Sequence, residues 1–283
     1  MISTWYQLET LYLFTRSDYK TIFFPVLAYS LAVSKEFTFG SLVSTIAWLW
    51  LHLLQANVSN QTFSGDEDMA NKPWRPLPSG RLTQRQARVL RWCLTMICLT
   101  VSALLGRVIL FSSAALTLVE ILHDDFGFSR NLVLKNLCNV GGYITFELGA
   151  GTCLSSGHNL DGNSLTALIC SGVIIFSTIS AQDFADVKGD VLSGRRTLPI
   201  ISPKGSRYYI LVILPLWSGS LVRLWSIGPI SGSIFVGLGA YVGIRFFWFR
   251  DEPSDRSNYV WYNIWLVVAH TLPYSTRTRL LLW

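Results

Sequence analysis

Residues 163–182 read NSLTALICSGVIIFSTISAQ, a run of twenty residues that contains no charged side chain. A helix of that length rises about 30 Å, which matches the hydrocarbon core of a bilayer. Eight further stretches are apolar enough to span in the same way: 19–35, 40–59, 89–105, 107–123, 134–156, 207–226, 228–248 and 258–275. The sequence therefore predicts an all-α integral membrane protein with about nine transmembrane helices.

The composition agrees with a protein whose main solvent is lipid. Hydrophobic residues make up 51% of the 283 residues and charged residues only 14%, whereas an ordinary soluble domain carries about 25% charged residues. The net charge of +6 does not indicate nucleic acid as a partner, because Lys and Arg form no contiguous stripe and lie between the apolar stretches. The composition therefore argues against a soluble enzyme and against a nucleic-acid-binding protein.

The distribution of Lys and Arg predicts the orientation in the lipid bilayer. With a cytosolic N-terminus, 18 of the 23 basic side chains fall on the cytosolic side and five on the other, in agreement with the positive-inside rule. No change of composition divides the chain, so we expect a single transmembrane domain over residues 1–283. Aromatic and leucine side chains at helical spacing predict that residues 1–16 form a helix lying in the membrane interface.

Two connections on the predicted cytosolic side are unusually long and polar: 60–88 and 183–206. Loops of this length in a compact protein are more often functional than idle. In the first loop, Asn60, Ser64 and Asp68 share one face if the preceding helix continues through them. In the second, three aspartates follow at helical spacing: Asp183, Asp186 and Asp190.

Carboxylates stacked at the end of an apolar helix repel one another and are costly to keep ionised without a partner. A divalent cation relieves both problems, and Mg²⁺ favours a few carboxylates together with the phosphate oxygens of a substrate. Basic side chains near the two acidic clusters would stabilise the charge of a departing diphosphate. These bases are Lys72, Arg75, Lys135, Lys188, Arg195 and Arg196. The simpler alternative is that all of these are solvated loop charges.

At these residues the chain resembles the UbiA superfamily of intramembrane prenyltransferases. The first motif of that family has the form NxxxDxxxD ahead of an RPxxxG segment, and the second has the form DxxxDxxxD or DxxDxxGD. Here the first-motif positions are Asn60, Ser64 and Asp68, followed by RPLPSG at 75–80, and the second-motif positions are Asp183, Asp186 and Asp190. Ser64 replaces the central acid of the first motif, so we expect Asp66 or Glu67 to compensate.

The resemblance implies helices around a central cavity that opens to the cytosolic side, with Mg²⁺ as the cofactor. The metal ligands that it implies are Asn60, Glu67, Asp68, Asp183, Asp186 and Asp190. Catalytic roles are implied for Asp68, Asp183 and Asp190. We expect the six basic side chains named above to bind the diphosphate of the substrate.

Further segments, among them SDYKTIFFP at 17–25 and FELGA at 146–150, resemble a fungal branch of the superfamily that is similar to membrane-bound terpene cyclases. The resemblance implies ionisation of farnesyl diphosphate and its cyclisation to a sesquiterpene, in an endoplasmic reticulum membrane if the protein is fungal. The alternative is a prenyltransferase that passes the prenyl group to an aromatic or quinone-precursor acceptor, with Arg16, Asp18 and Lys20 helping to form the acceptor pocket. A transporter is disfavoured, because the acids cluster at one surface.

Other polar residues within the predicted spans are open to two interpretations. Glu120 and Glu147 are site hypotheses because ionisable groups are rare at membrane depth, and Glu147 either faces the cavity or hydrogen-bonds between helices. The four histidines show no metal-ligand spacing, so we expect structural roles for them: His52, His123, His158 and His270. The chain also carries 11 Trp, 11 Tyr and 16 Phe, some of which would line a dry cavity and stabilise a carbocation.

Overall fold

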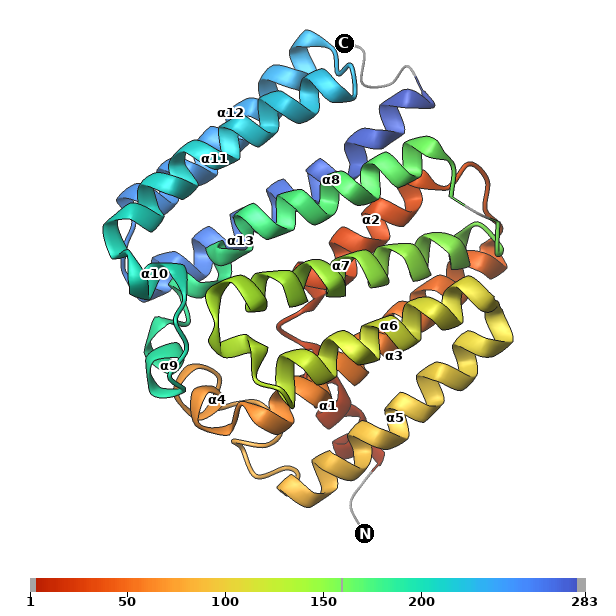
Figure 1. Ribbon diagram of the computed structural model, residues 1–283, viewed down its shortest axis with the longest axis vertical. Helices are drawn as coiled ribbons and strands as arrows, with labels where there is room; N and C mark the ends of the chain where they lie inside the picture. The colour runs from red at the N-terminus through yellow and green to blue at the C-terminus, as the bar shows by residue number, and fades with distance from the viewer. Residues whose placement is uncertain (1–3, 159, 279–283) are drawn as a thin grey trace.

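The computed structural model describes residues 4–158 and 160–278, and within them every regular element is a helix (Figure 1). The elements are α1 (Thr4–Thr15), η1 (Tyr19–Phe23), α2 (Phe24–Val33), α3 (Phe39–Phe63), α4 (Gly65–Asn71), α5 (Gln84–Leu105), α6 (Arg107–Asp124), η2 (Phe128–Arg130), α7 (Leu132–Leu154), α8 (Gly162–Thr178), η3 (Ile179–Phe184), α9 (Val187–Leu192), α10 (Leu198–Ile201), α11 (Pro203–Leu224), α12 (Pro229–Trp248), α13 (Glu252–Thr271) and η4 (Leu272–Thr276). A helix, alone or with a short helix in series, covers each of the nine predicted spans.

Local sequence explains where several of the long helices begin. Thr38 and Thr83 each cap a helix through a reciprocal capping box, α3 with Ser41 and α5 with Gln86. Between α5 and α6 the chain reverses at Gly106, whose φ of 147° is rarely adopted by a residue with a side chain. The capped ends and this sharp reversal set the lengths of α3, α5 and α6.

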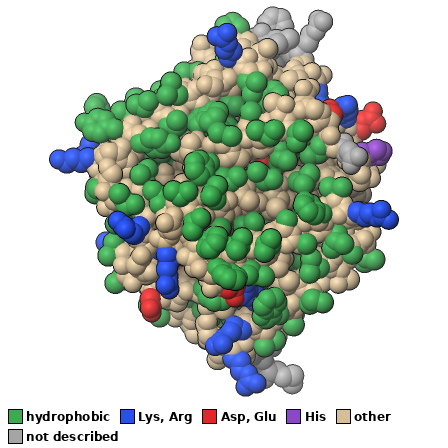
Figure 2. Space-filling view, viewed as in Figure 1, with side chains coloured by type: hydrophobic (Ala, Val, Ile, Leu, Met, Phe, Trp, Pro, Cys, Tyr) green, Lys and Arg blue, Asp and Glu red, His purple; other side chains and the backbone are tan. Residues whose placement is uncertain are grey.

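Four helical segments are long and apolar enough to cross a membrane: Phe39–Phe63, Gln84–Leu105, Gly162–Phe184 and Pro229–Trp248. Hydrophobic side chains cover much of the face in Figure 2, as expected for a surface that contacts lipid. Other long helices are less apolar because they carry polar groups that are buried inside the bundle, such as Lys135 and Glu147 on α7 and Asn258 and Asn263 on α13. The expected count of nine crossings stays a prediction.

Helix α7 lies at the centre of the bundle and takes part in both of the larger hydrophobic clusters. Its Tyr143 packs in the cluster formed with α2, α8 and α11 to α13, whereas Phe146 packs with Trp48 of α3 and Ile109 of α6. In Figure 1 the α11–α12 pair lies at one edge of the bundle and α5 at the other, with α7 between them. Residues of α7 are therefore placed to face a space enclosed by helices on both sides.

The N-terminal helix α1 exposes an apolar stripe. Trp5, Leu8 and Tyr12 are all exposed and follow at helical spacing, whereas Phe14 is buried against α3 and α5. Such a stripe is what an interfacial helix needs, although contact with a membrane stays a prediction. The first three residues of the expected 1–16 helix lie outside the described residues.

Close packing of α11 against α12 depends on glycine. A Cβ atom at Gly239 would lie 2.2 Å from the Oγ of Ser218 and 3.0 Å from the carbonyl oxygen of Leu214. Ser218 is fully buried, and its Oγ accepts a hydrogen bond from the indole N–H of Trp265 at 2.9 Å. Small residues that let backbones approach are typical of helix contacts in membranes.

Gly239→Ala should therefore destabilise the protein by about 1–3 kcal/mol, because the added methyl group pushes α12 away from α11. Thermal unfolding of the detergent-solubilised protein measures the effect. Gly237→Ala is the matched control, since its Cβ would meet nothing within 4 Å, and it should leave the melting temperature unchanged or slightly raised. Equal melting temperatures for the two variants would show that the close approach is not needed.

Candidate active site

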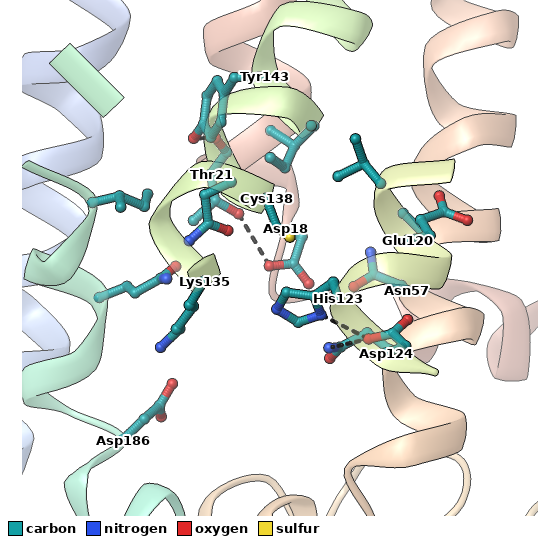
Figure 3. A pocket seen from close by; sticks show the side chains of 18 of the residues that line it. Asp18, Thr21, Asn57, Glu120, His123, Asp124, Lys135, Cys138, Tyr143 and Asp186 are labelled. Carbon is teal, nitrogen blue, oxygen red and sulfur yellow. Dashed lines mark hydrogen bonds and ion pairs between the residues drawn. The ribbon is translucent and has the colours of Figure 1, made fainter. Parts of the chain in front are cut away.

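A cavity of about 240 Å³ lies among η1, α3, α6, α7, η3 and α13, beside the short helices α4 and α9. Part of its lining is apolar, from Leu53, Ala56, Leu116, Val119 and Phe146. The polar and ionisable lining residues include Asp18, Asn57, Asn60, Glu67, Lys72, Arg75, Glu120, His123, Asp124, Lys135, Asp183, Asp186, Asp190 and Arg195. Figure 3 shows Lys135 and Asp186 facing His123 and Asp124 across the space.

The second acidic cluster lines the cavity in full. Its backbone is not one continuous helix, because the 3₁₀ turn η3 carries Asp183, Asp186 precedes α9, and Asp190 lies inside α9. Asp183 and Asp190 are buried, and Asp186 is partly buried. The broken helix therefore brings the three carboxylates to one space by a different route from the single helical face that the spacing suggested.

Each of these carboxylates has a basic partner. Oδ1 of Asp183 accepts a hydrogen bond from Nζ of Lys135 at 2.6 Å, and both side chains are buried. Nζ of Lys72 lies 3.2 Å from Oδ2 of Asp186. Nη1 of Arg195 lies 3.5 Å from Oδ1 of Asp190. Three expected diphosphate-binding residues and one expected metal-binding cluster thus meet in one place.

The first acidic cluster is divided between the cavity and its support. Helix α3 ends at Phe63 and α4 begins at Gly65, so Asn60, Ser64 and Asp68 do not share one continuous helix. Asn60 and Glu67 line the cavity, but Asp68 does not. Glu67 forms a two-pronged pair with Arg195, with two N···O distances of 2.9 Å.

Asp68 instead holds an arginine in place. Its Oδ1 accepts from Nη1 of Arg75 at 2.6 Å and its Oδ2 accepts from Oγ of Ser64 at 2.9 Å. Arg75 lines the cavity and also donates to Ser17 at 3.1 Å. The serine that replaces the expected central acid is therefore a hydrogen-bond donor to Asp68.

A single asparagine joins the two acidic loops. Nδ2 of Asn71 donates to the carbonyl oxygen of Asp186 at 3.1 Å, and Oδ1 of Asn71 accepts from the backbone N–H of Gly189 at 3.2 Å. A Cβ atom at Gly189 would lie 2.2 Å from Nδ2 of Asn71, so only glycine admits this contact. The contact fixes α4 against α9 at one end of the cavity.

Besides Asp68, three further residues considered for the site from the sequence lie away from the cavity lining. Lys188 pairs with Glu252 at 2.7 Å and is 79% exposed. Arg196 is exposed, and its backbone N–H donates to the carbonyl oxygen of Arg130. Asp66 is exposed, whereas its neighbour Glu67 is buried. Of the two acids considered as a replacement for the missing motif acid, the structure places Glu67 in the cavity.

Burial and neighbouring charge oppose each other in setting the pKa of the acids, and the net result differs between Glu67 of the first loop and Asp186 of the second. Burial raises the pKa of Glu67 above its ordinary value, and Arg195 opposes this only in part. Burial would also raise the pKa of Asp186, but Lys72, with smaller contributions from Lys135 and Arg75, holds that pKa below its ordinary value. Asp186 is therefore held as a carboxylate, whereas Glu67 gains from any further cation that approaches it.

The lining residues fit a divalent cation. Seven carboxyl groups and four Lys or Arg side chains line the cavity, so a diphosphate would meet excess negative charge unless cations accompanied it. Oδ2 of Asp183 and Oδ2 of Asp190 are buried without a hydrogen-bond partner. Within residues 4–158 and 160–278, no three His, Cys, Asp or Glu side chains are already grouped as a metal site. Two carboxylate oxygens without partners suit Mg²⁺, which takes few protein ligands and completes its shell with water and phosphate oxygens.

Sequence reasoning missed part of the opposite wall. Helix α6 contributes Glu120, His123 and Asp124 to the cavity, yet His123 was expected to be structural and Asp124 was not considered. The available signal was three ionisable groups in five residues at the end of an apolar stretch. Glu147 does not line this cavity; its Oε1 accepts from Ser171 at 2.6 Å and lies 2.8 Å from Nε2 of His270, so it hydrogen-bonds between helices.

Comparison with known proteins agrees with this geometry. The model of the UbiA prenyltransferase family matches residues 21–267. The chain is 31% identical to fumagillin beta-trans-bergamotene synthase of Aspergillus fumigatus, over 96% of this chain and 94% of that one. It is 25% identical to a diterpene cyclase of Hericium erinaceus, over 90% of this chain and 84% of that one.

The fold is also that of a solved relative. A UbiA homologue from Archaeoglobus fulgidus, solved with bound GPP and Mg²⁺, superimposes with a TM-score of 0.66 over 95% of this chain and 98% of that one, at 12% identity. Together with the family match over most of the chain, this confirms the resemblance inferred from the two motifs. The chain therefore belongs to the UbiA prenyltransferase family, whose members are terpene cyclases or prenyltransferases.

Proposed function

We propose that the protein ionises an isoprenyl diphosphate in this cavity with the help of Mg²⁺ and cyclises the resulting cation. The observation that carries the proposal is the meeting of the second acidic cluster, Asn60 and Glu67 of the first loop, and four bases in one cavity whose lining is in part apolar. A diphosphate needs the charged part and a prenyl chain needs the apolar part.

The acids and bases that now form ion pairs with each other are the groups that would bind Mg²⁺ and diphosphate. Lys135, Lys72 and Arg195 neutralise carboxylates, and the same groups are suited to the oxygens of a diphosphate. With Mg²⁺ and diphosphate bound, Asp183, Asp190 and Glu67 would hold the metal, and Lys135, Lys72 and Arg195 would hold phosphate oxygens. Because these acids and bases have partners both before and after binding, they avoid the cost of isolated buried charges.

The roles of individual residues follow from their positions. Asp183, Asp190 and Glu67 would hold Mg²⁺, with Asn60 and Asp186 beside them. Bound Mg²⁺ supplies the positive charge that makes diphosphate a good leaving group. Lys72, Arg75, Lys135 and Arg195 bind the departing diphosphate and stabilise its growing charge. Asp68 acts on the reaction through Arg75, whose guanidinium group it orients.

The apolar part of the cavity favours cyclisation. Phe146, Tyr143 and Tyr259 are among the lining residues, and aromatic faces stabilise a carbocation while apolar walls keep water away. Similarity to a bergamotene synthase and to a diterpene cyclase points the same way. We propose farnesyl diphosphate as the substrate and a cyclic sesquiterpene as the product. The second candidate is prenyl transfer to an aromatic acceptor, which the family description supports.

We also propose that the protein spans a membrane, with its active site on the cytosolic side. The helices that cover the nine apolar stretches would form a single transmembrane domain, with the acidic loops and the cavity mouth on the cytosolic side. The excess of Lys and Arg on that side supports this orientation. An endoplasmic reticulum location would follow if the protein is fungal.

Asp183→Asn should lower diphosphate release from farnesyl diphosphate by about 100-fold or more, because it removes a metal ligand and leaves Lys135 without its counter-charge. A phosphate-detection assay on detergent-solubilised protein, coupled to a pyrophosphatase, measures the release. The melting temperature of the variant checks that it folds.

Asp66→Asn is the matched control from the same chain, since Asp66 is exposed and lies outside the cavity. It should release diphosphate at the wild-type rate. Wild-type release by Asp183→Asn, or an equal loss in both variants, would contradict the proposed metal site.

Incubation with farnesyl diphosphate and Mg²⁺, without any acceptor, should yield a cyclic hydrocarbon that gas chromatography with mass spectrometry detects. EDTA should abolish the product because the carboxylates cannot bind diphosphate without cations. Release of diphosphate only after addition of an aromatic acceptor would favour the prenyltransferase. Geranyl and geranylgeranyl diphosphate, tested in parallel, establish the chain length.

A further inference from the structure

The wall of the cavity that α6 forms changes from apolar to ionisable along one face. Leu116, Val119 or Glu120, and His123 follow at helical spacing and all line the cavity. Figure 3 shows the His123 ring pointing into the space, across from Lys135 and Asp186. This wall therefore borders both the apolar part of the cavity and the charged part.

His123 forms a dyad with the next residue in the chain. Nδ1 of His123 lies 2.7 Å from Oδ1 of Asp124. Oδ2 of Asp124 accepts from Oγ of Ser59 at 2.6 Å, and Oδ1 also accepts from Nδ2 of Asn60 at 3.4 Å. The carboxylate is buried, so helix α3 fixes its position through these two donors.

The dyad sets the tautomer of the imidazole. The two oxygens of Asp124 are bonded to three side chains, those of Ser59, Asn60 and His123. Because a carboxylate oxygen accepts, Nδ1 of His123 is the nitrogen that donates to Asp124, and Nε2 is the ring nitrogen left to face the cavity. Within the described part of the chain, Nε2 of His123 forms no hydrogen bond, and His123 is the one histidine that lines this cavity.

The proposed reaction needs a group of this kind. A carbocation becomes an uncharged olefin only by losing a proton to a base. On the diphosphate wall, Lys135, Lys72 and the arginines are already protonated, and the carboxylates are held by ion pairs or would bind metal. The lone pair of Nε2 is free of both demands and faces the cavity.

We propose that His123, oriented by Asp124, is the base that takes the proton lost in the last step of the reaction; this rests on the proposed function. A C–H bond next to the cationic carbon breaks, and its electron pair becomes the new C=C double bond. The proton forms an N–H bond at Nε2. The resulting imidazolium is stabilised by the Asp124 carboxylate and later gives the proton to water.

The dyad also links α6 to α3, and a purely structural link would have different consequences. Loss of a structural link lowers the yield of all products together. Loss of a base changes how each ionised molecule ends, because a cation without a base is captured by water as an alcohol. The informative quantity is therefore the amount of olefin formed per diphosphate released.

His123→Gln should lower olefin formed per diphosphate released from farnesyl diphosphate by at least about tenfold, with prenyl or cyclic alcohols taking its place. The glutamine amide can still donate to Asp124 but cannot take up a proton at neutral pH. His158→Gln is the matched control, because His158 is exposed and does not line this cavity. It should keep the wild-type ratio.

A second variant keeps the test decisive if His123→Gln does not fold. His123→Ala opens space for a small base, so added imidazole should restore the ratio of olefin to diphosphate. Added imidazole should leave the wild-type ratio unchanged. Restoration by imidazole is a result that a structural link between α3 and α6 does not produce.

The outcomes separate this inference from the proposed function. If wild-type protein releases no diphosphate from any of the three prenyl diphosphates, the proposed function itself is wrong. If wild-type protein forms olefin, and His123→Gln keeps its ratio or imidazole fails to restore His123→Ala, the base is another group. A wild-type product made only of alcohols would also overturn the role of His123.

Discussion

The buried ion pair between Lys135 and Asp183, at 2.6 Å, expresses the constraint on which the site depends. Charge placed inside an apolar bundle must be paired, because an isolated buried ion costs several kcal/mol. Asp68 with Arg75, and Glu67 with Arg195, obey the same rule. The protein can therefore keep many charges in one cavity only by arranging acids and bases in alternation.

This alternation requires the backbone to break at two places. Continuous helices would carry the acidic loops away along the bundle axis, but the break at Ser64 and the 3₁₀ turn η3 fold both loops over the cavity. Asn71 and Gly189 then join the loops. The short helices α4 and α9 thus bring the acids and bases of the two loops close enough to form ion pairs.

The helices and the meeting of the second acidic cluster in one cavity could be predicted from the sequence, because both depend on local patterns. Runs such as 163–182 predict helices, and the spacing of Asp183, Asp186 and Asp190 predicts that they lie together, as they do in the cavity lining. The sequence does not predict which of the neighbouring acids Glu67 and Asp68 faces the cavity, because this depends on the break in the helix at Ser64. In the structure Glu67 lines the cavity and Asp68 supports Arg75. The same limit applies to Lys188, whose partner Glu252 belongs to a distant helix.

At the central position of the first motif, Ser64 stands where the family has an acid, and its hydroxyl group forms a hydrogen bond in place of that charge. An acid at residue 64 would add one more negative group beside Asp68, which already has Arg75 as its cation. The hydroxyl of Ser64 instead donates to Asp68, so the carboxylate is fully bonded and Arg75 remains fixed at the cavity wall. Glu67, turned inward by α4, lines the cavity, and we propose that it takes the place of the acid that position 64 lacks. In the proposed reaction, one wall of the cavity would therefore bind metal and diphosphate while the wall formed by α6 would present the His123 imidazole, and this separation would allow ionisation and proton loss to occur in the same small space.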